Sequence, residues 1–135
     1  MIEVVIADHQ EIYRIGLAEV LAVVDDVRIV GQPQSPGELL NTLQEANPHV
    51  LILSTDFLPK ISNIRRILRR RKTVLLLLAE ENDQTAYMQW LRAHGIVYRS
   101  MNEPALVDAV RRVARGELFI QDPSSDMTKE VPNVA

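Results

Sequence analysis

The chain has 135 residues, a formal net charge of -3, 47% hydrophobic residues and 24% charged residues. This length suits one domain with its own hydrophobic core, and the acidic balance excludes a molecule that binds polyanions over its whole surface. The chain has no cysteine, which excludes disulfides, thiolate zinc sites and cysteine nucleophiles. The N-terminus lacks the basic start of a signal peptide and no apolar run is long enough to cross a bilayer, so we expect a cytoplasmic protein.

Five short apolar runs alternate with helical patterns along the chain. The runs are continuous, as expected for parallel strands that are covered on both faces. They are Val4–Ala7, Val27–Val30, Val50–Leu53, Val74–Leu78 and Ile96–Tyr98. The helical stripes between and after them are Tyr13, Leu17, Val20, Leu21 and Val24; Leu39, Leu40 and Leu43; Ile61, Ile64, Ile67 and Leu68; Tyr87, Trp90 and Leu91; and Leu106, Ala109, Val110 and Val113. Ser35 and Glu38 form a capping box at the start of the second helix, with Pro36 at its first position.

The strand-then-helix order, repeated five times, determines the expected fold. Right-handed crossovers and helices on both faces predict an α/β domain of the (βα)5 type, with a doubly wound, five-stranded parallel sheet. At this length we expect the flavodoxin-like strand order 2-1-3-4-5. The pattern stops after Gly116, so we expect a domain over residues 1–119 and a tail, or the start of a linker, over residues 120–135.

Functional residues of open α/β sheets lie at the carboxyl ends of the strands. Four of the expected strands end at one edge, followed by Asp8 and His9; by Ser54, Thr55 and Asp56; by Leu78, Ala79, Glu80 and Glu81; and by Arg99 and Ser100. This edge is therefore the candidate site.

Several stretches resemble the receiver domain of bacterial two-component response regulators, particularly the NarL/FixJ-like subfamily. The stretches are residues 4–17, 30–31, 48–54 and 95–100, and the resemblance covers about residues 3–119. The Arg14-x-Gly16-Leu17 turn is typical of that subfamily. In such a family, two adjacent acids help to hold Mg²⁺, an aspartate accepts a phosphoryl group, and a Thr or Ser and a Lys offset the phosphate charge.

The chain departs from this pattern at most of these positions. Asp8 matches the first acid, but His9 follows it, and Ser54 stands at the acceptor position. Leu77 or Leu78 stands at the hydroxyl position, and Arg99 replaces the lysine. Ile96 also stands where the family carries a switch aromatic. The resemblance thus predicts a degenerate phosphorylation site with no cofactor.

The residues of this edge admit three other interpretations. Asp56 is a candidate displaced phosphoacceptor, because the family places a proline four residues after its aspartate and Pro59 fits neither Ser54 nor Asp56. Asp8, His9 and Asp56 are candidate ligands of a weak metal site, but we favour an ion pair between Asp8 and Arg99 and therefore no metal. Ser54 has only His9 as a candidate base, so we favour a polar residue that ends a strand.

The most basic stretch runs from Arg65 to Lys72. It suits a nucleic-acid surface, but no aromatic residues are interleaved for base stacking. We favour a solvated helix end, because cations are stabilised at a helix C-terminus.

We expect a phosphorylation-independent receiver that serves as a protein-interaction and regulatory module, and not an enzyme. The family implies a protein partner or a homodimer on the face of the fourth helix, fifth strand and fifth helix. Candidate residues there are Tyr87, Trp90, Tyr98 and Met101. DNA would be contacted only through a C-terminal helix-turn-helix domain absent from this chain, and we expect no membrane contact. The alternatives are a working receiver that uses Asp56 and a small-ligand-binding flavodoxin-like module, although no glycine-rich loop follows the first strand.

Overall fold

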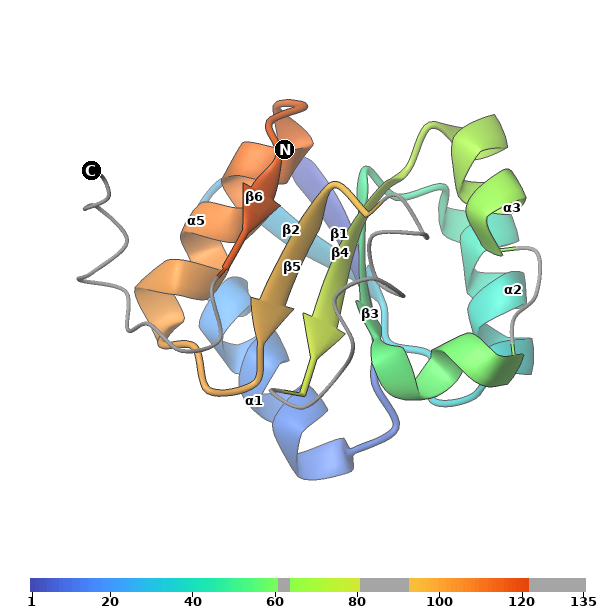
Figure 1. Cartoon of the computed structure of the whole chain (residues 1–135), viewed down its shortest axis with the longest axis horizontal. Helices are drawn as coiled ribbons and strands as arrows, with labels where there is room; N and C mark the ends of the chain where they lie inside the picture. The colour runs from blue at the N-terminus through green and yellow to red at the C-terminus, as the bar shows by residue number, and fades with distance from the viewer. Residues whose placement is uncertain (61–63, 81–92, 122–135) are drawn as a thin grey trace.

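The chain folds into one parallel sheet with helices on both faces (Figure 1). The computed structural model describes residues 1–60, 64–80 and 93–121. The strands are β1 (Ile2–Ala7), β2 (Val27–Gly31), β3 (Val50–Ser54), β4 (Val74–Ala79), β5 (Gly95–Tyr98) and β6 (Phe119–Ile120). The helices are α1 (Glu11–Ala22), α2 (Pro36–Ala46), the 3-10 helix η1 (Thr55–Lys60), α3 (Ile64–Arg71) and α5 (Glu103–Ala114).

The strand order is β2-β1-β3-β4-β5-β6, with every neighbouring pair parallel. The flavodoxin-like order 2-1-3-4-5 is thus confirmed. The expected number of five strands needs a correction, because β6 adds a short sixth strand beside β5. Phe119 N donates to His94 O at 3.0 Å and Gln121 N donates to Ile96 O at 2.9 Å. A strand of two residues is too short to give a periodic signal.

Gln121 belongs to the edge of the sheet, although the sequence placed it in the expected tail. Its side chain is buried, and its Oε1 accepts a hydrogen bond from Tyr98 N at 3.0 Å. The described structure therefore continues two residues past the expected boundary at residue 119. The division into a domain and a tail otherwise stays a prediction.

The core forms two layers, one on each face of the sheet. Helices α1 and α5 cover one face and α2 and α3 cover the other (Figure 1). Successive strand residues point to opposite layers, as the pleat requires. Leu76 and Leu78 of β4 join the α1/α5 layer, whereas Leu75 and Leu77 join the α2/α3 layer. Burial on both faces explains the continuous apolar runs.

The helix starts follow their capping residues. Ser35 Oγ accepts a hydrogen bond from Glu38 N at 3.3 Å, as the capping box predicts. The Glu38 carboxylate instead accepts from Gln34 N, one residue before the expected donor.

The fourth predicted helical stripe, Tyr87 to Leu91, and Ile61 lie outside the described residues. Within the described residues, no helix combines the length and the hydropathy that crossing a membrane requires.

Gly95 allows β5 to pack closely between β4, α5 and β6. A Cβ at this position would lie 2.7 Å from Leu76 Cδ1, 2.8 Å from Val113 Cγ1 and 3.1 Å from Phe119 O. We expect Gly95→Ala to lower the free energy of unfolding by about 1–3 kcal/mol, because these groups must move apart.

Gly16→Ala is the matched control, because a Cβ in this helical position meets nothing within 4 Å. We expect it to be neutral or to stabilise by up to about 1 kcal/mol. Urea denaturation of both variants measures the difference. Equal effects would contradict the close packing described for Gly95.

Candidate functional site

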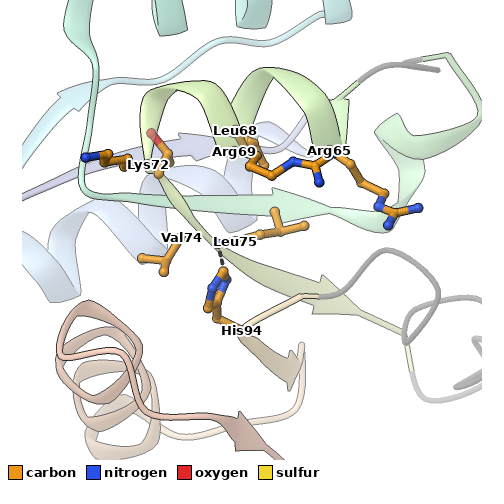
Figure 2. Close-up of a pocket in the computed structure, with 8 residues that line it drawn as sticks. Arg65, Leu68, Arg69, Lys72, Val74, Leu75 and His94 are labelled. Carbon is orange, nitrogen blue, oxygen red and sulfur yellow. Dashed lines mark hydrogen bonds between the residues drawn. The ribbon is translucent and has the colours of Figure 1, made fainter.

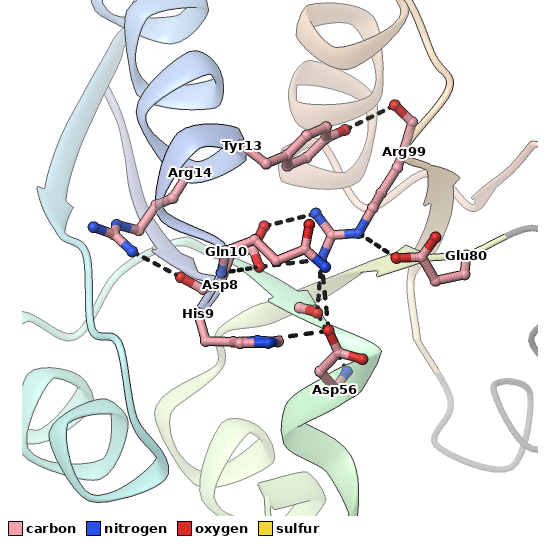
Figure 3. A network of polar contacts seen from close by, with 9 residues as sticks. Asp8, His9, Gln10, Tyr13, Arg14, Asp56, Glu80 and Arg99 are labelled. Carbon is pink, nitrogen blue, oxygen red and sulfur yellow. Dashed lines mark hydrogen bonds and ion pairs between the residues drawn. The ribbon is translucent and has the colours of Figure 1, made fainter.

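The carboxyl edge of the sheet gathers residues that are far apart in sequence. Ala7 pairs with Leu53, Ser54 with Leu78, and Ala79 with Tyr98. The residues at or just after these strand ends therefore meet, as Figure 3 shows for Asp8, Asp56, Glu80 and Arg99. Three of these four follow their strands directly, and Asp56 lies at the start of η1.

Arg99 forms a two-pronged ion pair with Asp8. Its Nη1 lies 2.8 Å from Asp8 Oδ2 and its Nη2 lies 3.1 Å from Asp8 Oδ1. The Asp8 side chain is fully buried, and that of Arg99 is 12% exposed. This arrangement confirms the expected pairing. Paired, charge-assisted hydrogen bonds of this kind fix the guanidinium both in position and in orientation.

Asp8 also accepts hydrogen bonds from Gln10 and Arg14. Gln10 N donates to Asp8 Oδ1 at 3.1 Å, and Arg14 Nη1 donates to the Asp8 backbone carbonyl at 3.0 Å. Arg14 is itself buried, so the Arg14 of the family-like turn supports the end of β1 from inside the fold. Both Asp8 carboxylate oxygens therefore have partners.

Ser54 is a buried partner of the same guanidinium. Its Oγ accepts hydrogen bonds from Arg99 Nη2 at 3.0 Å and from Asp56 N at 3.2 Å. The Ser54 hydroxyl thus binds the backbone just past the end of β3 and orients the Arg99 guanidinium. This agrees with the interpretation of Ser54 as a polar strand-ending residue, while His9 makes its ion pair with Asp56 instead.

Glu80 and Tyr13 complete the surroundings of Arg99. Glu80 Oε2 lies 2.7 Å from Arg99 Nε, whose N–H is not directed at it, so the contact is an ion pair and not a hydrogen bond. The Arg99 guanidinium carbon lies 4.5 Å from the centre of the Tyr13 ring, a cation–π contact. Tyr13 OH donates to the Arg99 backbone carbonyl at 3.1 Å.

Sequence reasoning placed Glu80 at this edge, because it follows a strand end, but gave it no role. It did not assign Tyr13 to the site. Tyr13 was counted only as a member of the apolar stripe of the first helix, and nothing in that stripe indicates a contact with the end of β5.

These contacts change the proton affinity of two side chains. Burial by itself lowers the pKa of Arg99. The hydrogen bonds and charge of Asp8, together with the charge of Glu80, raise this pKa by more than burial lowers it, so the pKa lies above its usual value. Burial raises the pKa of Tyr13 from 10.0 to about 12, partly opposed by the nearby Arg99 charge. Arg99 is thus a permanent cation and Tyr13 a neutral phenol at physiological pH.

The arrangement does not fit the Mg²⁺ that the family resemblance implies. Arg99 and the Gln10 amide occupy the Asp8 carboxylate, and His9 stands where a second acid would be needed. His9 Nδ1 lies 3.5 Å from Asp56 Oδ2, with side chains 53% and 39% exposed. Within the described ranges, no three His, Cys, Asp or Glu side chains gather as a metal cluster would.

The remaining predicted residues are apolar or buried. Leu78 pairs with Ser54 and lies in the α1/α5 layer, so it, rather than Leu77, stands at the hydroxyl position and offers no donor. Ile96 and Tyr98 are 1% and 2% exposed in the α2/α3 layer.

Of the four residues expected on the interaction face, the structure describes two, Tyr98 and Met101, and these lie in different layers. Tyr98 is buried, and this corrects its assignment to that face. Met101 is half-buried and packs against the opposite layer. Tyr87 and Trp90 lie outside the described residues.

Comparison with known proteins agrees with the arrangement of the sheet. No protein-family model matches the chain. The transcriptional regulatory protein DegU of Brevibacillus brevis is 25% identical over 125 residues, 88% of this chain and 52% of DegU. The response regulator GacA of Pseudomonas protegens is 28% identical over 126 residues, 89% of this chain and 59% of GacA. The isolated REC domain of RcsB from Salmonella enterica serovar Typhimurium, in its apo form, superposes with a TM-score of 0.79 at 25% identity, covering 91% of this chain and 95% of that domain.

The fold and these similarities are those of receiver domains of two-component signalling. Within this class, the chain is similar to the receiver domains of NarL/FixJ-type response regulators. The chain spans 52% and 59% of the lengths of DegU and GacA, respectively.

A double-mutant cycle tests the energetic role of the Arg99–Asp8 pair. We expect Arg99→Ala to lower the free energy of unfolding by about 3 kcal/mol, because it leaves the buried Asp8 carboxylate without its cation. Asp8→Asn should have a smaller effect, and the double variant should show a coupling of about 1 kcal/mol or more. Chemical denaturation of all four proteins gives these values.

Arg111→Ala is the matched control for this cycle. Arg111 also forms two hydrogen bonds to one aspartate, Asp26, but both side chains are more than 40% exposed. We expect a much smaller loss, since exposed ion pairs contribute little. Additive effects of Arg99→Ala and Asp8→Asn would mean that the two side chains do not stabilise each other.

The Tyr13 pKa of about 12 makes part of the stability depend on pH. The folded state holds the phenol proton more tightly than the unfolded state, in which the pKa is about 10. The contribution of Tyr13 is therefore complete below pH 10 and is lost as the pH rises toward 12. We expect the stability difference between the native chain and Tyr13→Phe to be constant from pH 7 to 9 and to shrink above pH 10. A difference that stays constant up to pH 12 would exclude the raised pKa.

Proposed function

We propose that this chain is a phosphorylation-independent receiver domain whose output state is set by Arg99. It acts as a protein-interaction and regulatory module in a signalling system and not as an enzyme. The observation that carries the proposal is that one guanidinium contacts both Asp8 and Ser54, at 2.8 Å and 3.0 Å. These are the positions where the family pattern places the first metal-binding acid and the phosphoacceptor.

The electrostatics of the edge support this proposal. A phosphoryl group brings negative charge, and an accepting carboxylate needs a metal ion and donors to offset it. Here the central cation is part of the chain and already has Asp8, Glu80 and Ser54 as partners. Displacing Arg99 would leave a fully buried Asp8 carboxylate unpaired, at a cost of about 3–5 kcal/mol. A phosphodonor would have to offset that cost before any reaction.

The proposed role is that of one part of a longer regulator. The similarity to DegU, a transcriptional regulatory protein, favours an origin in transcription control. RcsB, a structurally similar protein, has been solved as dimers bound to DNA. We infer that DNA contact would come from a separate C-terminal domain. The receiver itself would contact a protein partner or a second copy, through the face of the fourth helix, fifth strand and fifth helix that the family resemblance implies.

A displaced acceptor at Asp56 is the second candidate. Its side chain is 39% exposed, and its Oδ2 lies 3.9 Å from Arg99 Nη2 and 3.5 Å from His9 Nδ1. Asp56 is thus an accessible carboxylate beside a cation. It lacks a neighbouring hydroxyl from β4, where Leu78 stands.

Phosphorylation by a small donor separates the two candidates. We expect no phosphoryl adduct by intact-mass spectrometry after treatment with acetyl phosphate and Mg²⁺, because Ser54 is buried and bonded to Arg99. A labile adduct that maps to Asp56, and is lost in Asp56→Asn, would replace the proposal with the second candidate.

A variant that restores the family pattern is the positive control. It combines Ser54→Asp, His9→Asp, Leu78→Thr and Arg99→Lys on the same scaffold. We expect this variant, if its circular dichroism is native, to gain the adduct at residue 54. An adduct on the native chain at the same level as on this variant would contradict phosphorylation independence.

A further inference from the structure

We propose that the opposite edge of the sheet holds a second site, a basic pocket beside α3 that binds a small organic phosphate of nucleotide size. The cavity has a volume of about 370 Å³, within the range of roughly 300–1,000 Å³ typical of small-molecule sites. The cavity lies at the start of β4. Glu80 and the other partners of Arg99, which are Asp8 and Ser54 and are called the Arg99 cluster with it, lie at or past the end of β4. The six residues of β4 separate the two places by roughly 16 Å.

Three cations from α3 and its C-terminal turn line this pocket. Arg65 and Arg69 are four residues apart and therefore share one face of the helix, and Lys72 follows the helix end. Figure 2 shows Arg69 directed back along α3 toward Arg65, with Lys72 at the other end of the pocket. The described lining includes no acidic residue, and neither Arg69 nor Lys72 has an ion-pair partner among the described residues. On a chain of net charge -3, the pocket is a local concentration of positive charge.

A solvated helix end explains only part of this basic stretch. The helix dipole favours cations within the last turn, which accounts for Arg69, Arg70 and Arg71. It does not account for Arg65, which lies a full turn earlier, nor for a hollow beside it. Arg66 and Arg70 are exposed and do not line the cavity, so they fit the solvated interpretation.

The end of α3 places Lys72 at the pocket in an unusual backbone conformation. Thr73 N donates to Leu68 O at 3.0 Å and Lys72 N donates to Arg69 O at 3.2 Å, the bonding pattern of a Schellman motif. Lys72 has a φ of 59°, where glycine is the usual residue. The chain thus carries a cation at a position where local geometry alone would favour glycine.

The floor of the pocket is apolar, and one side of it is a positioned imidazole. Leu68 and Leu75 are 4% and 3% exposed, and Val74 lies beside them. His94 N donates to Leu75 O at 2.9 Å, and His94 Nδ1 accepts from Leu75 N at 3.4 Å (Figure 2). Because Nδ1 is an acceptor, the neutral ring carries its proton on Nε2, which is then available as a donor.

This combination determines the class of ligand. Arginine guanidinium groups match phosphate oxygens with paired donors, and a lysine adds a point charge. The aliphatic floor suits the flat, weakly polar surface of a nucleobase. A nucleoside phosphate has a phosphate for the cations and a base for the apolar floor. An inorganic anion would bind the cations but leave the apolar floor exposed to solvent. The pocket and its test are independent of Arg99.

Titration of the ¹⁵N-labelled full chain with ADP tests this site. We expect saturable shifts of the Leu68, Thr73, Leu75 and His94 amides, with the Arg99 amide unchanged. The variant with both Arg65→Gln and Arg69→Gln should bind ADP at least about tenfold more weakly, since each charged hydrogen bond contributes about that factor.

The variant with both Arg66→Gln and Arg70→Gln is the matched control, because it removes the same charge at the same spacing from the same helix. It should weaken ADP binding by less than about threefold, the effect of a screened surface charge. Equal weakening by the two variants, or no saturable shift, would overturn the proposal. Adenosine or pyrophosphate binding as tightly as ADP would overturn the assignment to a nucleoside phosphate, and hexaglutamate binding more tightly would assign the pocket to an acidic protein segment instead.

Discussion

The contact between Arg99 and the buried Asp8 is the interaction on which the functional edge depends. A fully buried carboxylate is unfavourable unless a cation and hydrogen-bond donors satisfy it. Arg99 supplies the cation, and the same guanidinium then reaches Ser54 and Glu80. Four strand ends are thereby tied together by one side chain. The sheet has the architecture of a receiver domain. At the centre of its carboxyl edge lies the permanently charged guanidinium of Arg99.

Much of this edge could be predicted from sequence because parallel strands bring their carboxyl ends together. The continuous apolar runs predicted the strands, and their alternation with helices predicted the strand order. The residues at two strand ends predicted the Asp8–Arg99 pair. Tyr98 was misplaced on the surface, although it lies two residues after Ile96 in a strand and so shares its buried face. The β6 strand and the Tyr13 contact depend on tertiary pairing, which short segments do not reveal.

The two ends of the sheet have different chemistry on one rigid platform. At the carboxyl end, Arg99 forms ion pairs with Asp8 and Glu80 and a hydrogen bond with Ser54. At the amino end, the cations of α3 border a cavity without an acidic residue among its described lining. If the amino end binds a diffusible anion, as proposed, the domain has a second place at which a signal can act, separate from the Arg99 edge. Strand β4 connects the two places through the core, and both of its neighbours, β3 and β5, contribute to the Arg99 cluster.

The most direct test of Arg99 as the occupant of the phosphorylation centre is a crystal structure grown with Mg²⁺ and BeF3-, the phosphomimetic present in one RcsB receiver structure. We expect Arg99 to stay within hydrogen-bond distance of both Asp8 carboxylate oxygens and of Ser54 Oγ, with no fluoride or metal ion between them. A structure with Arg99 turned toward solvent, Mg²⁺ on Asp8 and beryllofluoride on Asp56 would contradict a site that its own arginine has filled.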